Sequence, residues 1–222
     1  MRLTLFDLDG TLLPGDSDHA FGEFVVAIGW ADGQAFRRAN DKFYADYLAG
    51  CLDIHAYVDF ATAPWRRRSA PELAQASARF LAEVAQPMVL PAALALVQGH
   101  RLQGDLMAIV TATNDFVTRP IAALLGVDQL IATELARDVQ GNITGSIQGR
   151  PCFREGKITR VHDWLAAQGR SMGDFERCTF YSDSTNDLPL LECVSHPVAT
   201  NPGPALERIA QERGWPILKL FT

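Results

Sequence analysis

The sequence predicts an α/β fold of three layers, in which a doubly wound parallel sheet carries helices on both faces and is interrupted by an all-helical insertion. From about residue 88 onward, short apolar runs alternate with segments whose apolar residues recur every three or four positions, a pattern typical of alternating strands and helices. Between residues 15 and 87, helical periodicity continues through four segments with no strand between them. We therefore expect an α/β core of residues 1–14 and 88–222 and a helical cap domain of residues 15–87.

The first expected strand is Arg2–Phe6, an apolar run that ends directly at Asp7. Helices follow, and Ser69 or Ala70, just before Pro71-Glu72, is a plausible start for the last of them. The four helical segments are AFGEFVVAIGW, AFRRANDKFYADYLAG, HAYVDFA and APELAQASARFLAEVA. Four consecutive helices without a strand indicate a small separate module.

The α/β pattern resumes after Leu90-Pro91. The stretch VQGNITGSIQGRPCF, at residues 139–153, alternates around Gly141-Asn142 and Gly145 and predicts a β-hairpin. The other expected elements are, in chain order, a helix over 92–99, a strand over 106–110, a helix over 116–125 that ends at Gly126, a strand around QLIATEL, a helix over 157–168, a strand over 178–182, a helix over 188–193, a strand over 196–200, a helix over 204–213 and a strand in PILKLF. Strands that alternate with helices in this way predict a parallel sheet.

The composition predicts a soluble globular protein of the cytoplasm. The 222 residues, 48% of them hydrophobic, suffice for one domain and a modest second module. A net charge of −6 argues against non-specific binding to nucleic acid or to an anionic membrane. No apolar run approaches the roughly 20 residues that span a bilayer, and the N-terminus lacks the layout of a signal peptide. The scattered Cys51, Cys152, Cys178 and Cys193 form no CxxC pair, so we expect buried free thiols rather than disulfides or zinc ligands.

Polar residues follow several of the expected strands, at the edge of an open sheet where ligands bind. These residues are Asp7, Asp9, Thr111, Asp183 and Asp187, together with Lys157 at the start of a helix. Several carboxylates without a His or Cys cluster suit Mg²⁺, which takes one or two carboxylates, keeps waters and contacts substrate phosphate. A lysine and a hydroxyl suit the remaining phosphate oxygens, and an aspartate can act as a nucleophile. The residues therefore predict phosphoryl transfer with Mg²⁺.

Four segments resemble the motifs of the haloacid dehalogenase (HAD) superfamily in order and spacing. They are DLDGT, the strand that ends in Thr111, the lysine in EGKITRVHDWL, and YSDSTNDLPLL. The helical insertion directly after the first motif resembles the cap of the phosphoserine phosphatase-like subfamily. The resemblance implies a HAD-like, Rossmannoid core and hydrolase activity.

The resemblance also implies roles for the four aspartates of these motifs. Asp7 would attack phosphorus, and Asp9 would protonate the leaving oxygen and then deprotonate the hydrolytic water. Mg²⁺ would be held by the Asp7 carboxylate, the Asp9 backbone carbonyl and Asp183, with Asp187 supporting the waters of the metal. An acid needs its proton, so we expect a raised pKa for Asp9. An aspartate two residues after the nucleophile favours phosphate esters over dehalogenation.

The phosphoryl oxygens would be bound, by the same resemblance, by Thr111, the backbone N–H of Ala112, and Lys157. Asn186 would order the loop of the fourth motif or contact the phosphate. Lys157 depends most on this resemblance, because a single lysine outside the motif would be interpreted as a solvated side chain.

Residues near the start of the insertion have two interpretations. An acidic residue at the cap junction contacts the substrate amino group in the phosphoserine phosphatase family, and Asp16 lies near that position with an aspartate in place of glutamate. Equally, Asp16 or Ser17 caps the first helix of the insertion. His19 is close enough to contact substrate. The run Arg66–Arg68 either binds a substrate anion or is a solvated surface, and the solvated surface is favoured.

The expected function is Mg²⁺-dependent hydrolysis of the phosphate monoester of a small metabolite through a phospho-Asp7 intermediate, by a monomer or homodimer. A phosphorylated amino acid or amino alcohol, such as phosphoserine or histidinol phosphate, is the leading substrate class. A phosphotransferase or phosphomutase would use the same aspartate. A non-catalytic phosphate-binding protein is the third possibility, although binding alone needs no positioned nucleophile and acid.

Overall fold

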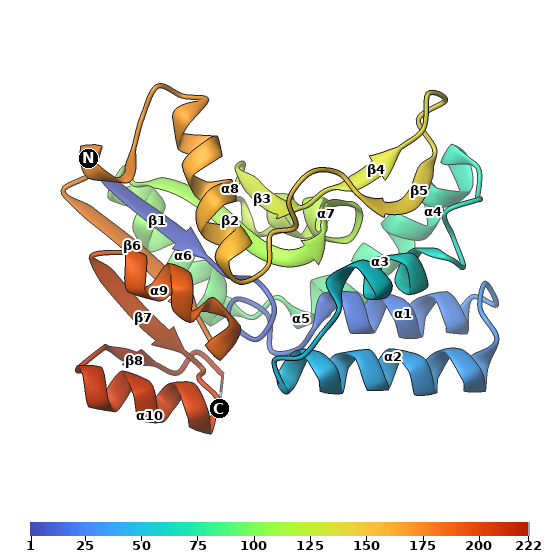
Figure 1. Ribbon diagram of the computed structural model, residues 1–222, viewed down its shortest axis with the longest axis horizontal. Coiled ribbons are helices and arrows are strands. Elements are labelled where there is room, and N and C mark those ends of the chain that lie inside the picture. The colour runs from blue at the N-terminus through green and yellow to red at the C-terminus, as the bar shows by residue number, and fades with distance from the viewer. Residues whose placement is uncertain (222) are drawn as a thin grey trace.

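The computed structural model describes residues 1–221 and contains a parallel sheet of six strands (Figure 1). In spatial order the strands are β3 (Leu130–Thr133), β2 (Leu106–Asn114), β1 (Arg2–Phe6), β6 (Arg177–Ser182), β7 (His196–Thr200) and β8 (Ile217–Leu218). β1 pairs in parallel with both β2 and β6, so the first strand of the chain lies inside the sheet. The predicted parallel α/β sheet is confirmed.

Helices cover both faces of the sheet, as the sequence predicts (Figure 1). One face packs on α6 (Pro91–Leu102) and α7 (Asp115–Leu125), and the other on α8 (Glu155–Ala166), α9 (Leu188–Cys193) and α10 (Pro204–Arg213). The residues of β1 show why helices pack on both faces of the sheet. Leu3 and Leu5 belong to the cluster of α8, whereas Phe6 belongs to the cluster of α6 and α7. Successive side chains of a strand point to opposite faces, and both faces of β1 are apolar or buried.

Between β1 and β2 the chain forms the predicted run of helices (Figure 1). They are α1 (Ser17–Ala27), α2 (Gly33–Leu48), α3 (Ile54–Thr62), α4 (Ala70–Phe80), a π-helical segment (Leu81–Ala85) and α5 (Gln86–Met88). Ser69 caps α4 in a capping box with Glu72, as its position before Pro71 predicts. The rings of Trp65 and Phe116 stack with centroids 4.7 Å apart, which joins this helical insertion to α7. The insertion and one sheet face therefore share a single apolar cluster.

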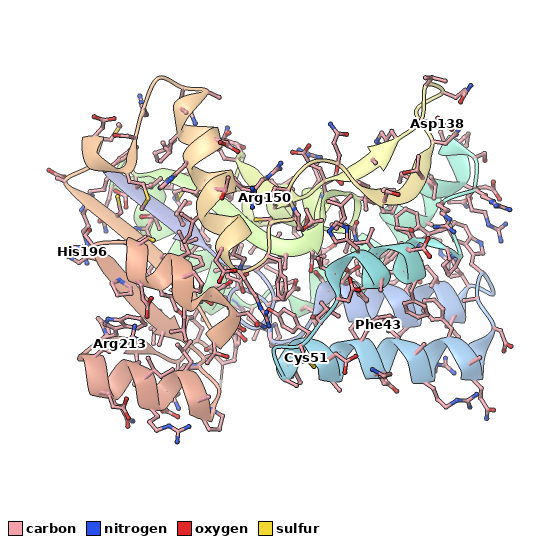
Figure 2. The ribbon with its side chains drawn as sticks, in the orientation of Figure 1. Phe43, Cys51, Asp138, Arg150, His196 and Arg213 are labelled. Atoms are coloured by element: carbon pink, nitrogen blue, oxygen red, sulfur yellow. The ribbon has the colours of Figure 1, made fainter. Side chains whose placement is uncertain are left out.

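A β-hairpin of β4 (Leu135–Arg137) and β5 (Ile143–Ile147) lies apart from the main sheet and packs against α3. Figure 2 shows Asp138 at its tip. The hairpin begins at Leu135, before the predicted stretch 139–153, and its turn contains the predicted Gly141-Asn142. The Asp138 carboxylate supports this turn by accepting hydrogen bonds from the N–H groups of Gln140 and Asn142, both at 2.9 Å. The hairpin lies outside the helical insertion, residues 15–87, in which the structure places helices and no strand.

Two other strand boundaries differ from the prediction. β2 continues four residues past Val110, because β3 still pairs with it at Asn114. β8 has two residues instead of six, since the Asn201 side-chain oxygen accepts the N–H groups of Leu220 and Phe221 that a longer strand would use. The β2 extension matters for the site, because it includes Thr111 and Thr113, in a stretch where the register between β2 and β3 shifts.

All four cysteines are free thiols. Cys152 and Cys178 are buried as predicted, whereas Cys51 and Cys193 are exposed, so the expectation of burial is wrong for that second pair.

Within residues 1–221, no single helix has the length and apolarity to cross a membrane. The segments 70–88 and 91–102 meet that test only when they are counted together, and they meet at an angle of 91°.

Candidate active site

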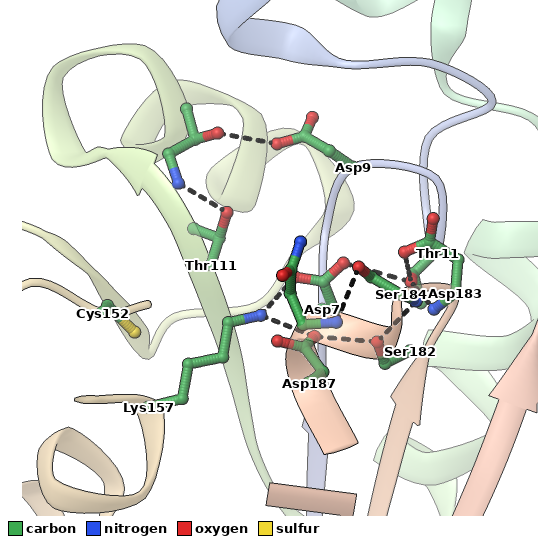
Figure 3. Close-up of polar contacts among 12 residues, drawn as sticks. Asp7, Asp9, Thr11, Thr111, Cys152, Lys157, Ser182, Asp183, Ser184 and Asp187 are labelled. Carbon is green, nitrogen blue, oxygen red and sulfur yellow. Dashed lines mark hydrogen bonds and ion pairs between the residues drawn. The ribbon is translucent and has the colours of Figure 1, made fainter. Parts of the chain in front are cut away.

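The carboxyl ends of β1, β2 and β6 bring the predicted polar residues to one edge of the sheet (Figure 3). Asp7 follows β1, Thr111 lies in β2, and Asp183 follows β6. Lys157 is in the first turn of α8, and Asp187 lies in the short 3-10 helix Thr185–Asp187 after β6. Parallel strands end at the same edge, which is why residues so distant in sequence meet there.

Lys157 joins two of the predicted aspartates. Its Nζ lies 2.8 Å from Asp7 Oδ1 and 2.7 Å from Asp187 Oδ2, and its side chain is only 2% exposed. Burial alone would lower the pKa of Lys157, but the carboxylates of Asp187 and Asp7 raise it above its ordinary value. A lysine in this position stays cationic.

Asp187 is fully engaged with protein groups. Besides Lys157, the Ser182 hydroxyl donates to Asp187 Oδ2 at 2.8 Å. Burial raises the pKa of Asp187 to about 6, while the charge of Lys157 opposes that shift. Asp187 therefore positions Lys157 in this structure.

Asp7 and Asp183 face the two sides of the Thr11 hydroxyl. Thr11 Oγ1 lies 3.2 Å from Asp7 Oδ2 and 3.2 Å from Asp183 Oδ1, and it accepts the N–H of Asp183 at 3.0 Å. Burial raises the pKa of Asp183 well above its ordinary value, and the nearby charge of Asp7 raises it further. Two buried carboxylates this close repel each other, and a cation beside them would remove that repulsion.

The turn after β1 brings the backbone against Asp183. Gly10 has φ +74°, and a Cβ there would lie 2.2 Å from Asp183 Oδ2. Only glycine suits both the left-handed conformation and the close approach. Asn201, after β7, donates from Nδ2 to the carbonyls of Gly10 (2.9 Å) and Thr11 (3.1 Å), which holds the loop in place.

The Asp9 carboxylate points away from this group. Thr113 Oγ1 donates to Asp9 Oδ2 at 2.9 Å, and the N–H of Ser17 donates to Asp9 Oδ1 at 2.7 Å. Burial raises the pKa of Asp9 to about 7, and the charge of Asp16 adds to the rise. A carboxyl group with this pKa can hold a proton near neutral pH and release it, as the sequence led us to expect.

A cavity opens beside Asp7 and Asp9. β2 supplies Thr111, Ala112 and Thr113 to one wall. The helical insertion supplies the rest: Asp16, Asp18, His19, Phe43, Tyr44, Tyr47, Leu52, Ile54 and Tyr57. The cavity therefore lies between the end of β2 and the helical insertion.

The structure confirms the helix-cap interpretation of Asp16, while its contact with substrate stays a prediction. It is the N-cap of α1, where its Oδ1 accepts the N–H of His19 at 2.7 Å, and it also lines the cavity. His19 lines the cavity too, with its Nε2 2.9 Å from Asp41 Oδ1. Burial raises the pKa of Asp16, and it raises the pKa of Asp18 strongly.

Other predicted contacts lie outside the cavity lining. Asn186 Nδ2 donates to the carbonyl of Tyr47 at 3.0 Å, so it connects the fourth motif to α2. Arg66 pairs with Asp59, and Arg68 lies 3.4 Å from Glu72. The structure thus agrees with a solvated role for Arg66–Arg68.

Several residues of the site escaped the sequence analysis. They are Thr11, Thr113, Asn114, Arg154, Asn201 and Tyr57. Thr113 had a signal, because residues two apart on a strand point to the same face, and Thr111 was already assigned there. Asn201 had none, since its contacts with the loop after β1 lie 190 or more residues away in sequence.

The donor atoms beside Asp7 are suited to Mg²⁺. The carboxylates of Asp7 and Asp183 and the carbonyl of Asp9 supply only hard oxygens, and no group of three or more His, Cys, Asp or Glu side chains within residues 1–221 is arranged to hold a metal by itself. Mg²⁺ usually takes one or two carboxylates and completes its shell with water and phosphate, so two carboxylates fit. The Asp187 carboxylate contacts Lys157 and the Asp9 carboxylate contacts Thr113, which is compatible with the predicted roles of the Asp9 carbonyl and of Asp187 beside the waters of the metal.

Known proteins resemble this chain over its whole length. A histidinol-phosphatase of Neisseria meningitidis serogroup C is 44% identical over 98% of each chain, and the phosphoserine phosphatase SerB1 of Mycobacterium tuberculosis is 32% identical over 96% of this chain and 68% of its own. A crystal structure from Bordetella pertussis Tohama I, of a protein described as of unknown function, superposes with TM-score 0.93 at 47% identity over 99% of both chains. A substrate-bound phosphoserine phosphatase superposes with TM-score 0.68 at 16% identity, over 97% of this chain and 91% of its own, and shares the fold.

The family model of the haloacid dehalogenase-like hydrolases matches residues 4–192, a span that includes every motif aspartate and Lys157. Together with the parallel sheet and the aspartates at its edge, this match shows that the chain belongs to the haloacid dehalogenase-like hydrolases.

Proposed function

We propose that this protein hydrolyses the phosphate monoester of a small metabolite, with Asp7 as nucleophile and Mg²⁺ as cofactor. The observation that carries the proposal is the pair of buried aspartates at one end of the cavity, which have different partners. Asp7 is held by the cationic Lys157, whereas Asp9 is held by Thr113 and Ser17 and has a pKa of about 7. One is suited to attack and the other to transfer a proton. The histidinol-phosphatase and phosphoserine phosphatase relatives support the same class of substrate.

In the first step, a carboxylate oxygen of Asp7 attacks phosphorus. A bond forms between Asp7 and the phosphoryl group while the ester P–O bond breaks, and Asp9 gives its proton to the departing oxygen. Thr111, the N–H of Ala112 and Lys157 bind the phosphoryl oxygens in this proposal. Lys157 offsets the negative charge that builds up as two anions approach.

In the second step, Asp9 removes a proton from water, and the water oxygen attacks phosphorus. The bond to Asp7 breaks, phosphate leaves, and both aspartates return to their starting state. Thr113 and the N–H of Ser17 keep the Asp9 carboxylate in one orientation for both proton transfers.

Mg²⁺ would be held by the carboxylates of Asp7 and Asp183 and by the Asp9 carbonyl, and it would supply positive charge beside the phosphoryl group. Asp187 would act through Lys157 and Ser182, and through waters, rather than as a direct ligand. Thr11 orients the two carboxylates that hold the metal.

Residues 15–87 form a cap in this proposal, over a core of residues 1–14 and 88–222. The cap supplies most of the cavity wall, so it selects the leaving group and excludes water during the first step. Asn186 and Arg154 support a fixed cap, because they contact the carbonyls of Tyr47 and Gly50, respectively. We assign the protein to the cytoplasm, which four free cysteines support.

The proposal is tested by hydrolysis of p-nitrophenyl phosphate with added Mg²⁺. Asp7→Asn should abolish turnover, whereas Asp163→Asn, at an exposed position on α8, should keep it. A chelator should stop the wild type, and fresh Mg²⁺ should restore it. Turnover by Asp7→Asn at the wild-type rate would overturn the proposal.

A further inference from the structure

We propose that the leaving group of the substrate carries a positive charge and no carboxylate, and that Asp18 is the residue that selects it. The proposal rests on the phosphatase function above and adds the chemical class of the ester: the phosphate of a small amino alcohol or a comparable cationic alcohol.

The cavity lining is acidic, and Lys157, which pairs with Asp7, is not part of it. Four carboxylates line it, and neither lysine nor arginine does. His19 is the one residue with a titratable nitrogen in the lining, and its Nε2 already contacts Asp41. A leaving group with a carboxylate would lose its hydration here and gain only like charges as neighbours. A cationic leaving group would instead gain partners that are already in place.

Asp18 is the carboxylate that the rest of the mechanism leaves available. Asp7 and Asp9 take part in the chemistry, and Asp16 accepts the N–H of His19 at the start of α1. Asp18 is 7% exposed and lies in the cavity lining. Asn114 and Tyr57 hydrogen-bond to Asp18, but no lysine or arginine of the described residues forms an ion pair with it. A buried carboxylate without a cation is costly to retain, which points to a cationic ligand as its partner.

The orientation of Asp18 is built into β2. Asn114, the last residue of β2, donates from Nδ2 to Asp18 Oδ1 at 3.0 Å. Asn114 is also the N-cap of α7, where its Oδ1 accepts the N–H of Val117. Because its oxygen and its nitrogen both have partners, the Asn114 amide has a single orientation. The preceding residue, Thr113, holds Asp9. The end of β2 therefore holds both Asp9, the proposed proton-transfer group, and Asp18, and it fixes the distance between them.

Aromatic side chains complete the cavity wall around this charge. Phe43, Tyr44 and Tyr47 come from α2, where Figure 2 shows Phe43, and Tyr57 comes from α3. Aromatic faces attract ammonium groups, and the attraction grows where water is excluded. An acidic group among aromatic rings is the arrangement that recognises an organic cation, and the same rings can also stack on a flat cationic heterocycle.

The nearest candidate for binding a carboxylate is engaged elsewhere. Arg154 donates to the carbonyl of Gly50 and, at 3.4 Å, to Asn186 Oδ1, and it does not line the cavity. One relative is named a histidinol-phosphatase and another a phosphoserine phosphatase. The acidic cavity suits an ester without a carboxylate, such as histidinol phosphate, and disfavours phosphoserine.

The test compares kcat/KM for three esters of similar size: phosphoethanolamine, which is cationic, propyl phosphate, which is neutral in the alcohol part, and phosphoserine, which adds a carboxylate. We expect phosphoethanolamine to exceed each of the others by about 10-fold or more, the effect of one charge-assisted contact. Histidinol phosphate should be hydrolysed better still, because its ring reaches the aromatic wall. Equal rates for the three small esters, or a preference for phosphoserine, would overturn the inference.

The variant Asp18→Asn tests whether Asp18 is the source of this selectivity. The variant should bring the ratio of phosphoethanolamine to propyl phosphate close to one, while Asp163→Asn keeps the wild-type ratio. If Asp18→Asn does not fold, inhibition of the wild type decides: ethanolamine should compete with substrate at concentrations at which propanol has no effect. Hydrolysis of p-nitrophenyl phosphate by the wild type separates the two proposals. Its loss contradicts the phosphatase function, whereas its presence without cation selectivity contradicts only the role of Asp18.

Discussion

Lys157 Nζ lies 2.8 Å from Asp7 Oδ1, although the two residues are 150 positions apart in sequence (Figure 3). Asp187 completes the group at 2.7 Å from the same nitrogen. Burial raises the pKa of Asp7, and the charge of Lys157 opposes that rise. The contact also holds the proposed nucleophile in one orientation. It also joins α8 to β1, so it serves the stability of the fold as well as the reaction.

Replacing Lys157 by Met should therefore reduce both activity and stability. Turnover of p-nitrophenyl phosphate should fall by about 100-fold or more, because a positive charge beside the reacting oxygens is lost. Urea unfolding should show a loss of about 3–5 kcal/mol, since Asp7 and Asp187 remain buried without a cation beside them. The exposed Lys42 provides a matched Lys→Met control that should keep its activity. Full activity in Lys157→Met would contradict the assigned role.

Gly10→Ala should weaken the binding of Mg²⁺. The new Cβ would meet Asp183 Oδ2 at 2.2 Å and displace a proposed metal ligand. The concentration of Mg²⁺ that gives half-maximal activity should rise at least about 10-fold, the effect of roughly 1.4 kcal/mol. Gly104→Ala is a close control, because Gly104 has the same φ of +74° with nothing within 4 Å of the new Cβ. An equal dependence on Mg²⁺ in the two variants would show that backbone strain, not the contact with Asp183, is responsible.

Thr113→Val should slow the chemical step. The substitution keeps the shape of the side chain but removes the hydrogen bond to Asp9 Oδ2, so the carboxyl group loses its fixed orientation. We expect kcat to fall about 10-fold, in line with the loss of one hydrogen bond to a charged group, with little change in KM. Thr144→Val, on the exposed hairpin, should behave like the wild type. A change confined to KM would indicate that Thr113 contacts the substrate and does not act through Asp9.

Asp105 should make stability depend on pH in the acidic range. Its side chain is 3% exposed and contacts Arg2, His100 and Thr4. Burial alone would raise the pKa of Asp105, but the hydrogen bonds from His100 and Thr4 and the charge of Arg2 lower it below 3.8. A carboxyl group whose pKa is lower in the folded state stabilises the protein above its unfolded pKa, and this contribution fades as the pH falls through the folded value.

Asp105→Asn should accordingly unfold more easily than the wild type at pH 7, by about 1–3 kcal/mol. The difference should shrink as the pH falls below about 4. Urea unfolding of both proteins at a series of pH values measures it, and a difference that stays constant down to the lowest pH would show that the carboxylate charge is not what stabilises the fold.

The sequence predicted most of the sheet and the motif residues, because both depend on local patterns. Apolar runs that end at Asp7 and Asp183 indicate strands, and parallel strands end at one edge. The residues that line the cavity could not be predicted from such local patterns. Tyr57 and Phe43 have the helical spacing of ordinary core residues, and only the packing of α2 and α3 turns them toward Asp18. The glycine signal located the turn of the hairpin at Gly141-Asn142, but its first strand, Leu135–Arg137, begins at the end of the stretch QLIATEL, which was predicted as part of another strand.

The most direct test of the central claim is the mass of the protein when it is quenched with acid during turnover of a saturating substrate. We predict a phosphoryl adduct on the peptide that contains Asp7, absent from Asp7→Asn. An adduct on a peptide without Asp7, or one that persists in Asp7→Asn, would contradict the account.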